Sequence, residues 1–192
     1  MSLNEVETLA WKAARGAGLP WGVADDAGRA AAWIAARFGM WAETLLALLE
    51  TPPPPDESPL LLAGFLADSG VPRRIGRVVA PLWALPGLLA APARPVAIRL
   101  GDTADIGCNP GEHPGATLPP DALAALGASA LAVDYPGANL SPLPYALAPK
   151  FRRGVVPVVA WRRLEALAYR TYVPATDRSR RTGAGAGLLD DE

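Results

Sequence analysis

The chain has 192 residues, of which 51% are hydrophobic and 19% charged, a balance that excludes a chain disordered throughout. Its formal net charge of −1 argues against a nucleic-acid-binding protein, because such proteins usually present a basic surface. The single cysteine rules out an internal disulfide, which favours a reducing, cytoplasmic location.

The first fifty residues predict a helical segment. Ser2 and Glu5 have the spacing of a capping box, in which the Ser2 hydroxyl accepts from the Glu5 backbone N–H and the Glu5 side chain accepts from the Ser2 backbone N–H. Apolar residues then recur at helical spacing. Gly16 and Gly18 predict the end of this first helix.

Two more helices are expected before residue 51. Pro20 opens the second, which runs to Phe38, and a leucine-rich third covers residues 40–50. Their apolar stripes, and that of the first helix with Leu9, predict core packing, since stripes at this spacing usually bury area. The segment 1–50 is therefore interpreted as structural.

A proline-rich connector, residues 51–59, separates this segment from an α/β portion, residues 60–192, within what we expect to be one compact domain. A short helix is predicted from Pro59 to Leu66. The longest apolar run, 78–93, contains three prolines and is shorter than the ~20 residues that span a membrane, so a helix or broken helix over 81–91 is expected instead.

The rest of the chain predicts a small sheet with flanking helices. Strands are expected over residues 95–100, 130–134 and 155–159, a long loop over 102–118, a short helix over 121–126 and an amphipathic helix from Trp161 to Tyr172. Together these elements predict an α+β fold, with a helical N-terminal layer packed on the sheet.

The loop 102–118 holds the only cysteine and the only histidine of the chain. Cys108 and His113 are spaced so that a nucleophile and its base can meet across a turn, and the alternative is a small buried cysteine beside an incidental turn. Asp102, at the start of the loop, is a candidate ligand contact. The carboxylates nearby are potential metal ligands, but the spacing matches no zinc motif, so neither a metal nor another cofactor is predicted.

Asp134 ends a predicted strand. A carboxylate in that position is a candidate general base, and it is also a common turn former that bonds its own backbone.

The final twenty residues place arginines before three alternating glycines. Glycine lets backbone N–H groups turn toward an anion, and arginine offers a forked donor for a carboxylate or phosphate. The run lacks the preceding strand and following helix of a dinucleotide or phosphate-binding loop. One interpretation is a segment that lies across the fold as structure. In the other, the segment binds a ligand through Arg178, Arg180, Gly183, Gly185 and Gly187.

Two blocks carry a resemblance. The opening Ser2-Leu-Asn-Glu-Val-Glu-Thr-Leu-Ala-Trp-Lys, and Tyr172-Val-Pro-Ala-Thr-Asp-Arg-Ser-Arg with Gly-Ala-Gly-Ala-Gly-Leu, resemble the two ends of an uncharacterised bacterial family of unknown function. The first block is also similar to the first helices of the malate/lactate dehydrogenase type with a non-Rossmann fold. That family's next motif, Ser-His-Gly, carries its catalytic histidine, whereas this chain has Ala36-Arg-Phe-Gly-Met, so the resemblance implies no dehydrogenase activity here.

These observations predict a protein of bacterial metabolism that recognises a small anionic metabolite, as an enzyme or as a ligand-binding protein. Its site would combine the loop 102–115 with the C-terminal arginines. The alternative is an accessory or interaction subunit of a metabolic enzyme, and a homo-oligomer agrees with either. Neither nucleic acid nor a membrane is an expected partner. A cavity joining His113, Asp134 and Arg180 would favour the first function, and a broad exposed apolar patch would favour the second.

Overall fold

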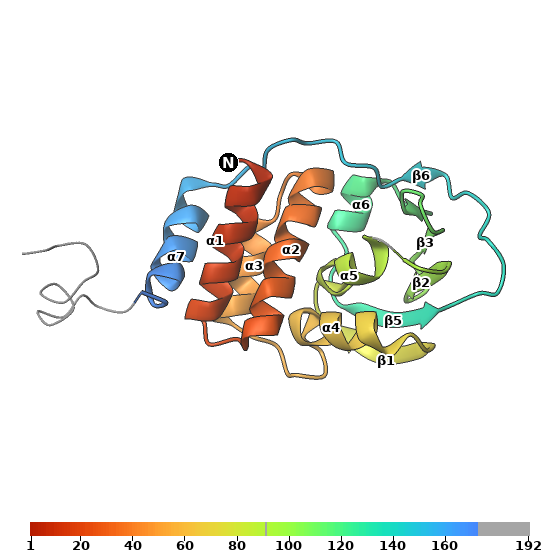
Figure 1. The fold of residues 1–192 in the computed structure, drawn as a ribbon, viewed down its shortest axis with the longest axis horizontal. Coiled ribbons are helices and arrows are strands. Elements are labelled where there is room, and N and C mark those ends of the chain that lie inside the picture. Colours follow the sequence, from red (N-terminus) through yellow and green to blue (C-terminus); the bar gives the residue numbers. More distant parts are fainter. Residues whose placement is uncertain (91, 173–192) are drawn as a thin grey trace, which may run out of the picture.

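The computed structural model describes residues 1–90 and 92–172 (Figure 1). Within these residues, a layer of long helices stands beside a six-stranded antiparallel sheet. Short helices contact the long helix of the layer that lies nearest the sheet. The predicted α+β class, a helical layer packed on a small sheet with flanking helices, is confirmed.

The helical layer consists of α1 (Leu3–Gly16), α2 (Trp21–Phe38), α3 (Ala42–Glu50) and α7 (Val158–Tyr169). Helix α1 packs between α2 and α7 (Figure 1). Its capping box is present as predicted: the Glu5 backbone N–H donates to Ser2 Oγ at 3.3 Å, and the Ser2 N–H donates to Glu5 Oε2 at 2.6 Å. The end of the helix at Gly16 is also confirmed, since Gly18 follows with a φ of +97°.

The apolar stripe of α1 is narrower than predicted. Val6, Ala10 and Ala13 are fully buried. Leu9 is only partly buried, because it lies at the edge of the stripe and faces the space between α1 and α7. The prediction of core packing is therefore correct for the helix, and Leu9 packs against the edge of the core.

Proline opens each of the short elements between the layer and the sheet. These are α4 (Pro59–Ser69), a 3₁₀ helix (Pro81–Ala84), α5 (Pro86–Leu89) and α6 (Pro120–Ala124). The broken helix predicted over 81–91 is thus confirmed, and its prolines divide it. Among the helices of the described residues, none has the length and apolar character needed to cross a membrane.

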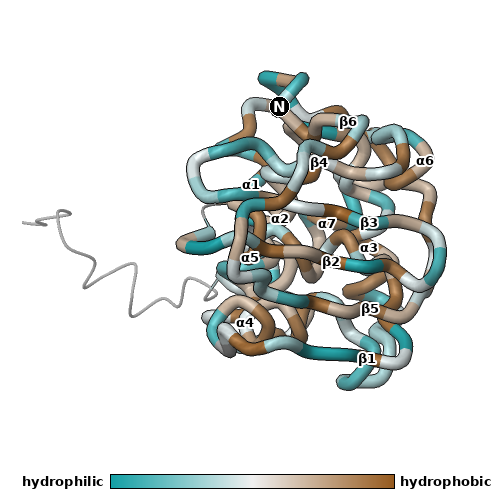
Figure 2. Tube along the Cα trace, turned by 90° about the vertical axis from the view of Figure 1, so that its right-hand side faces the viewer, coloured by the Kyte–Doolittle hydropathy of each residue, from teal (hydrophilic) through white to brown (hydrophobic). Residues whose placement is uncertain are grey.

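The sheet has the strand order β1-β5-β2-β3-β4-β6, with every neighbouring pair antiparallel. Figure 2 looks onto its open face, with β6 at the top and β1 at the bottom. The strands are β1 (Arg73–Val78), β2 (Val96–Leu100), β3 (Ala104–Cys108), β4 (Gly115–Ala116), β5 (Ser129–Asp134) and β6 (Tyr145–Ala146).

The register of the sheet separates a buried face from an open one. Ile98 of β2 is opposite Ile106 of β3 and Val133 of β5, and all three are buried. Their neighbours point the other way, as the period of two requires. Arg99 therefore emerges on the open face, opposite Asp105 and Ala132.

Two predictions about extended structure need correction. The loop expected over 102–118 contains β3 and β4, whose alternation was obscured by their glycine and aspartate residues. The strand expected over 155–159 does not form. Val155 makes only an isolated bridge to Met40, and helix α7 begins at Val158. The buried residues of this helix recur at helical spacing, which favours a helix over a strand here: Ala160, Leu164, Leu167 and Ala168. Strand β1 was not predicted at all.

Candidate ligand-binding groove

The open face of the sheet is hollowed into a groove of about 660 Å³, called here the sheet groove. Its floor is formed by small residues of β2, β3 and β5: Ala97, Gly107, Ala130 and Ala132. Alanine and glycine are depleted in strands, whose solvent faces usually carry larger side chains. The small residues leave open space above the backbone and make this face accessible.

One wall of the sheet groove is the loop between β5 and β6. Leu140 and Leu143 of this loop lie over two glycines of the sheet. A Cβ atom at Gly107 would lie 2.9 Å from Leu140 Cδ1, and one at Gly115 would lie 3.0 Å from Leu143 Cβ. Only glycine at these two positions lets the apolar wall come this close to the strands.

Asn109 fixes the loop in place. Its Nδ2 donates to the Leu140 carbonyl at 3.1 Å, and its Oδ1 accepts from the Leu140 N–H at 2.9 Å. The same Nδ2 donates to Glu112 Oε2 at 3.0 Å. Because Asn109 is 8% exposed, these bonds satisfy a side chain that would otherwise be costly to bury.

Two arginines flank a gap on the groove floor. Arg74 of β1 and Arg99 of β2 are both opposite Ala132 of β5, so the three residues form one row across the sheet. Two strand spacings place the arginine backbones roughly 10 Å apart. The methyl group of Ala132 is the only side chain between them in this row, so no long side chain fills the space above the β5 backbone.

Carboxylates surround the second of these arginines. Arg99 Nε donates to Asp105 Oδ1 at 3.0 Å. This hydrogen bond raises the pKa of the Arg99 guanidinium, and the negative charges of Asp102 and Asp134 raise it further. With Arg74 included, the charged lining comprises two guanidinium groups and three carboxylates. The groove therefore matches a ligand with one anionic group better than a polyanion.

Two of the sequence-predicted site residues meet in the sheet groove. Asp102 lies in the turn after β2, and Asp134 is the last residue of β5. The assignment of Asp102 to ligand binding and of Asp134 to catalysis stays a prediction.

Cys108 and His113 lie apart from that pair. The Cys108 side chain faces the core at 2% exposure, with Sγ 3.5 Å from the carbonyl oxygens of Asn109 and Glu112. Burial raises the pKa of the Cys108 thiol, and the charge of Glu112 adds to the increase. His113 is exposed in the turn after β3, and in the described chain no hydrogen bond joins it to Cys108.

The small cavity of about 140 Å³ that both residues line adjoins the sheet groove but does not contain Asp134. A raised thiol pKa makes the thiolate scarce near neutral pH, which is unfavourable for a nucleophile. Among residues 1–90 and 92–172, no group of three or more potential ligands is arranged to hold a metal ion.

The remaining predicted contacts lie outside the described residues. They are Arg178, Arg180, Gly183, Gly185 and Gly187.

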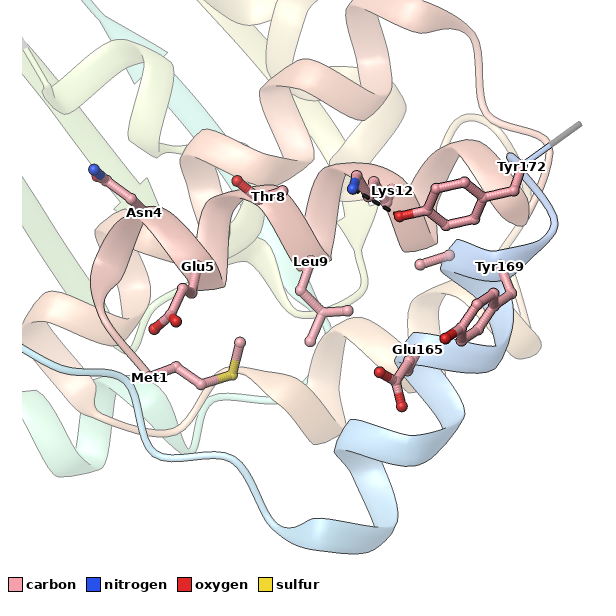
Figure 3. A pocket seen from close by; sticks show the side chains of 10 residues that line it. Met1, Asn4, Glu5, Thr8, Leu9, Lys12, Glu165, Tyr169 and Tyr172 are labelled. Atoms are coloured by element: carbon pink, nitrogen blue, oxygen red, sulfur yellow. Dashed lines mark hydrogen bonds between the residues drawn. The ribbon is translucent and has the colours of Figure 1, made fainter. Parts of the chain in front are cut away.

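A second cavity, the helix cleft, lies between α1 and α7 and has a volume of about 390 Å³ (Figure 3). Lys12 donates from Nζ to the Tyr172 hydroxyl at 2.9 Å across its end. The rings of Tyr169 and Tyr172 lie 5.6 Å apart, and Leu9 forms part of the floor. The cleft therefore combines aromatic and aliphatic surface with the charged side chains of Glu5, Lys12 and Glu165.

Sequence reasoning missed Arg74, Arg99 and Asn109. The alternation of residues 96–100 contains the signal for Arg99, because it places that side chain opposite the buried ones. Arg74 belongs to a strand with weak alternation, and Asn109 acts through a partner 31 positions away in the chain. Neither role is visible from local pattern.

Residues 1–49 match the model of a family described as "Protein of unknown function (DUF3726)". The matched stretch covers α1, α2 and nearly all of α3, and so it contains none of the residues that line the sheet groove. No curated protein and no solved structure gave a significant match. The match agrees with the resemblance of the first block to an uncharacterised family, and the similarity to the malate/lactate dehydrogenase type finds no support.

Proposed function

We propose that the protein binds a small anionic metabolite in the sheet groove. The observation that carries the proposal is the row in which Arg74 and Arg99 flank the small residue Ala132. Two guanidinium groups on either side of a gap provide forked donors for one carboxylate or phosphate group.

The rest of the groove defines the remainder of the ligand. The alanine floor and the wall formed by Leu140 and Leu143 suit an aliphatic body. Asp102 and Asp134 supply acceptors for an ammonium or hydroxyl group on the same molecule. A volume of about 660 Å³ is within the usual range for small-molecule sites. A short aliphatic acid, with or without an amino group, fits this description.

Calorimetric titration with hexanoate, norleucine and hexylamine tests the proposal, since these molecules share an aliphatic chain and differ in charge. Hexanoate and norleucine should bind and hexylamine should not. Arg74→Ala should weaken the binding of both acids by roughly tenfold or more, because hydrogen bonds to charged groups are the stronger kind.

Arg77→Ala is the matched control. Arg77 lies on the same strand but outside the groove, where it pairs with Glu57, so its removal should leave binding unchanged. Binding of hexylamine alone would show that the carboxylates dominate and would contradict an anion site. An equal loss of affinity in Arg74→Ala and Arg77→Ala would show that the overall charge of the protein, and not the groove, is responsible.

The alternative function, an accessory subunit without catalysis, is favoured by the helix cleft. Tyr169 and Tyr172 are exposed aromatic residues that line this hollow, and aromatic residues are enriched at protein interfaces. Sedimentation velocity on the wild type and on Tyr169→Asp tests this in its simplest form, self-association. A species larger than a monomer that disappears in the variant supports an interaction role, and identical monomers in both weigh against it.

A further inference from the structure

One corner of the helical layer combines exposed apolar side chains with a high density of positive charge. It is formed by residues 150–163, which end the long connection from β6 and begin α7, together with Met40 (Figure 1). The sequence of this segment is Lys-Phe-Arg-Arg-Gly-Val-Val-Pro-Val-Val-Ala-Trp-Arg-Arg. We call it the basic–apolar corner.

The apolar side chains of the corner are open to solvent. Their exposed fractions are 74% for Met40, 44% for Phe151, 65% for Val155, 60% for Val158 and 71% for Val159. Single exposed apolar residues are ordinary on a protein surface, whereas a contiguous group marks an interaction site. Here the bridge between Met40 and Val155 brings Met40 beside the exposed residues of the segment.

The corner is held firmly to the fold. The Gly154 N–H donates to the Met1 carbonyl at 3.0 Å, and the Met1 ammonium donates back to the Gly154 carbonyl at 3.3 Å. Arg153 bridges to Ser2, and Val155 bridges to Met40. A Cβ atom at Gly154 would lie 2.6 Å from a methyl carbon of Val6, so the segment is seated directly on α1. The apolar side chains therefore project from an anchored backbone.

Positive charge borders the apolar residues on both sides in the sequence. The cations are Lys150, Arg152, Arg153, Arg162 and Arg163. The same stretch contains no Asp or Glu, although the whole chain has a net charge of −1. Arg163 pairs with Glu50. For the other four, no ion pair is present within the part of the chain that the structure describes.

We propose that the basic–apolar corner is a docking surface for an anionic lipid bilayer, on which the protein sits without crossing it. Valine, methionine and phenylalanine side chains would enter the headgroup region, and the flanking arginines would contact lipid phosphates and carboxylates. This proposal departs from the expectation, made from the sequence, that a membrane is not a partner. That expectation followed from the lack of a spanning segment, and a surface contact needs none.

Charge complementarity and side-chain chemistry select a lipid surface. Apolar residues between two basic clusters are the pattern of interfacial segments, in which the aliphatic groups insert while the cations stay at the phosphate level. Trp161, 40% exposed, lies at the border between the valines and Arg162, where indole rings favour the interface.

Vesicle co-sedimentation of the full chain tests the proposal. Vesicles of phosphatidylcholine containing about one third phosphatidylserine should bind the protein, and pure phosphatidylcholine should not. High salt should weaken the binding through screening. Arg152→Glu with Arg162→Glu should lower the partition coefficient by roughly twenty-five-fold or more, at about fivefold for each basic residue lost.

A second variant, Val158→Asp with Val159→Asp, tests the apolar contribution without endangering the fold. Both positions are exposed in the first turn of α7, where a carboxylate is favourable for the helix dipole. This variant should abolish binding with an unchanged circular dichroism spectrum. The control Arg77→Glu reverses a charge on β1, away from the corner. Its binding should differ from that of the wild type only by the small effect of the altered net charge.

Four outcomes would overturn the proposal. No binding to the anionic vesicles, or equal binding by the aspartate variant, removes the lipid role of the corner. A dimer of the full chain that the aspartate variant lacks assigns the surface to a second copy. If a chain shortened to residues 1–172 binds the vesicles and the full chain does not, the corner is assigned to residues 173–192 as its occupant.

Discussion

At the scale of single residues, glycines determine how closely the elements pack. Helix α1 ends at Gly16 where α7 passes, and a Cβ atom there would lie 1.7 Å from the carbonyl oxygen of Leu167. A contact with backbone cannot be relieved by rotating a side chain. The identity of this one residue therefore sets the distance between the first and last helices of the described chain.

Gly16→Ala should destabilise the protein by about 1–3 kcal/mol or more, as overpacking against a rigid neighbour does. Gly22→Ala is the matched comparison, because Gly22 lies in α2 with nothing within 4 Å of an added Cβ. That variant should stabilise by roughly 0.4–1 kcal/mol, since alanine restricts the unfolded chain. Urea unfolding measures both, and equal effects would contradict the close contact at Gly16.

Leu9 and Leu45 provide a second comparison between residues of the same type. Leu45 is fully buried in α3, whereas Leu9 is partly exposed to the helix cleft. Leu45→Ala should cost about 2–5 kcal/mol through lost burial and a remaining cavity. Leu9→Ala should cost less, about 1 kcal/mol, because part of that side chain is already in contact with water and its removal leaves no closed cavity. Chemical denaturation at fixed pH measures both, and similar costs for the two variants would mean that the cleft is closed in solution.

At the scale of elements, the sequence predicted what local pattern encodes. The capping box of Ser2 and Glu5 and the prolines of the broken helix were sufficient to place helix starts. Strand pairing was a different problem, because β1 pairs with β5 more than fifty positions later. For the same reason the sequence pointed to Asp102 and Asp134 individually, while the groove that both line depends on pairings between β1, β2, β3 and β5.

The loop between β5 and β6 yields a prediction at this scale. Asn109→Ala removes both hydrogen bonds to Leu140, so the loop should open and the wall of the sheet groove should loosen. Proteolysis within residues 135–144 should become faster, and binding of hexanoate should weaken. Asn109→Asp is the informative companion, because it keeps the acceptor for the Leu140 N–H but loses the donor and places a negative charge beside Glu112.

Asn109→Asp should fall between the wild type and Asn109→Ala in loop protection if the Oδ1 acceptor contributes to the clamp. An unchanged cleavage rate in Asn109→Ala would show that Leu140 and Leu143 hold the loop by packing alone.

At the scale of the whole molecule, the two ends of the described chain meet. Helix α7 comes from the portion predicted as residues 60–192, yet it packs against α1 of the predicted segment 1–50. Amphipathic periodicity predicted α7 itself, but no local signal states which helix it will cover. The buried residues of the helical layer and the sheet also belong to one continuous cluster. The stability of the first three helices is therefore tied to the rest of the chain.

This arrangement predicts that the N-terminal helices do not fold alone. A fragment of residues 1–50 would expose the face of α1 that α7 covers and the face of α2 that contacts α4, α5 and α6. Helical stability in proteins comes mostly from packing of an apolar face, so circular dichroism of the fragment should show little helix.

In the full chain, far-ultraviolet circular dichroism and tryptophan fluorescence should report one coincident transition in urea, because Trp33 and Trp41 lie in the layer and Trp83 lies in the 3₁₀ helix beyond it. Two separated transitions, or a stably helical fragment, would mean that residues 1–50 are an independent unit, and the tight packing of α7 on Gly16 would then have little influence on their folding.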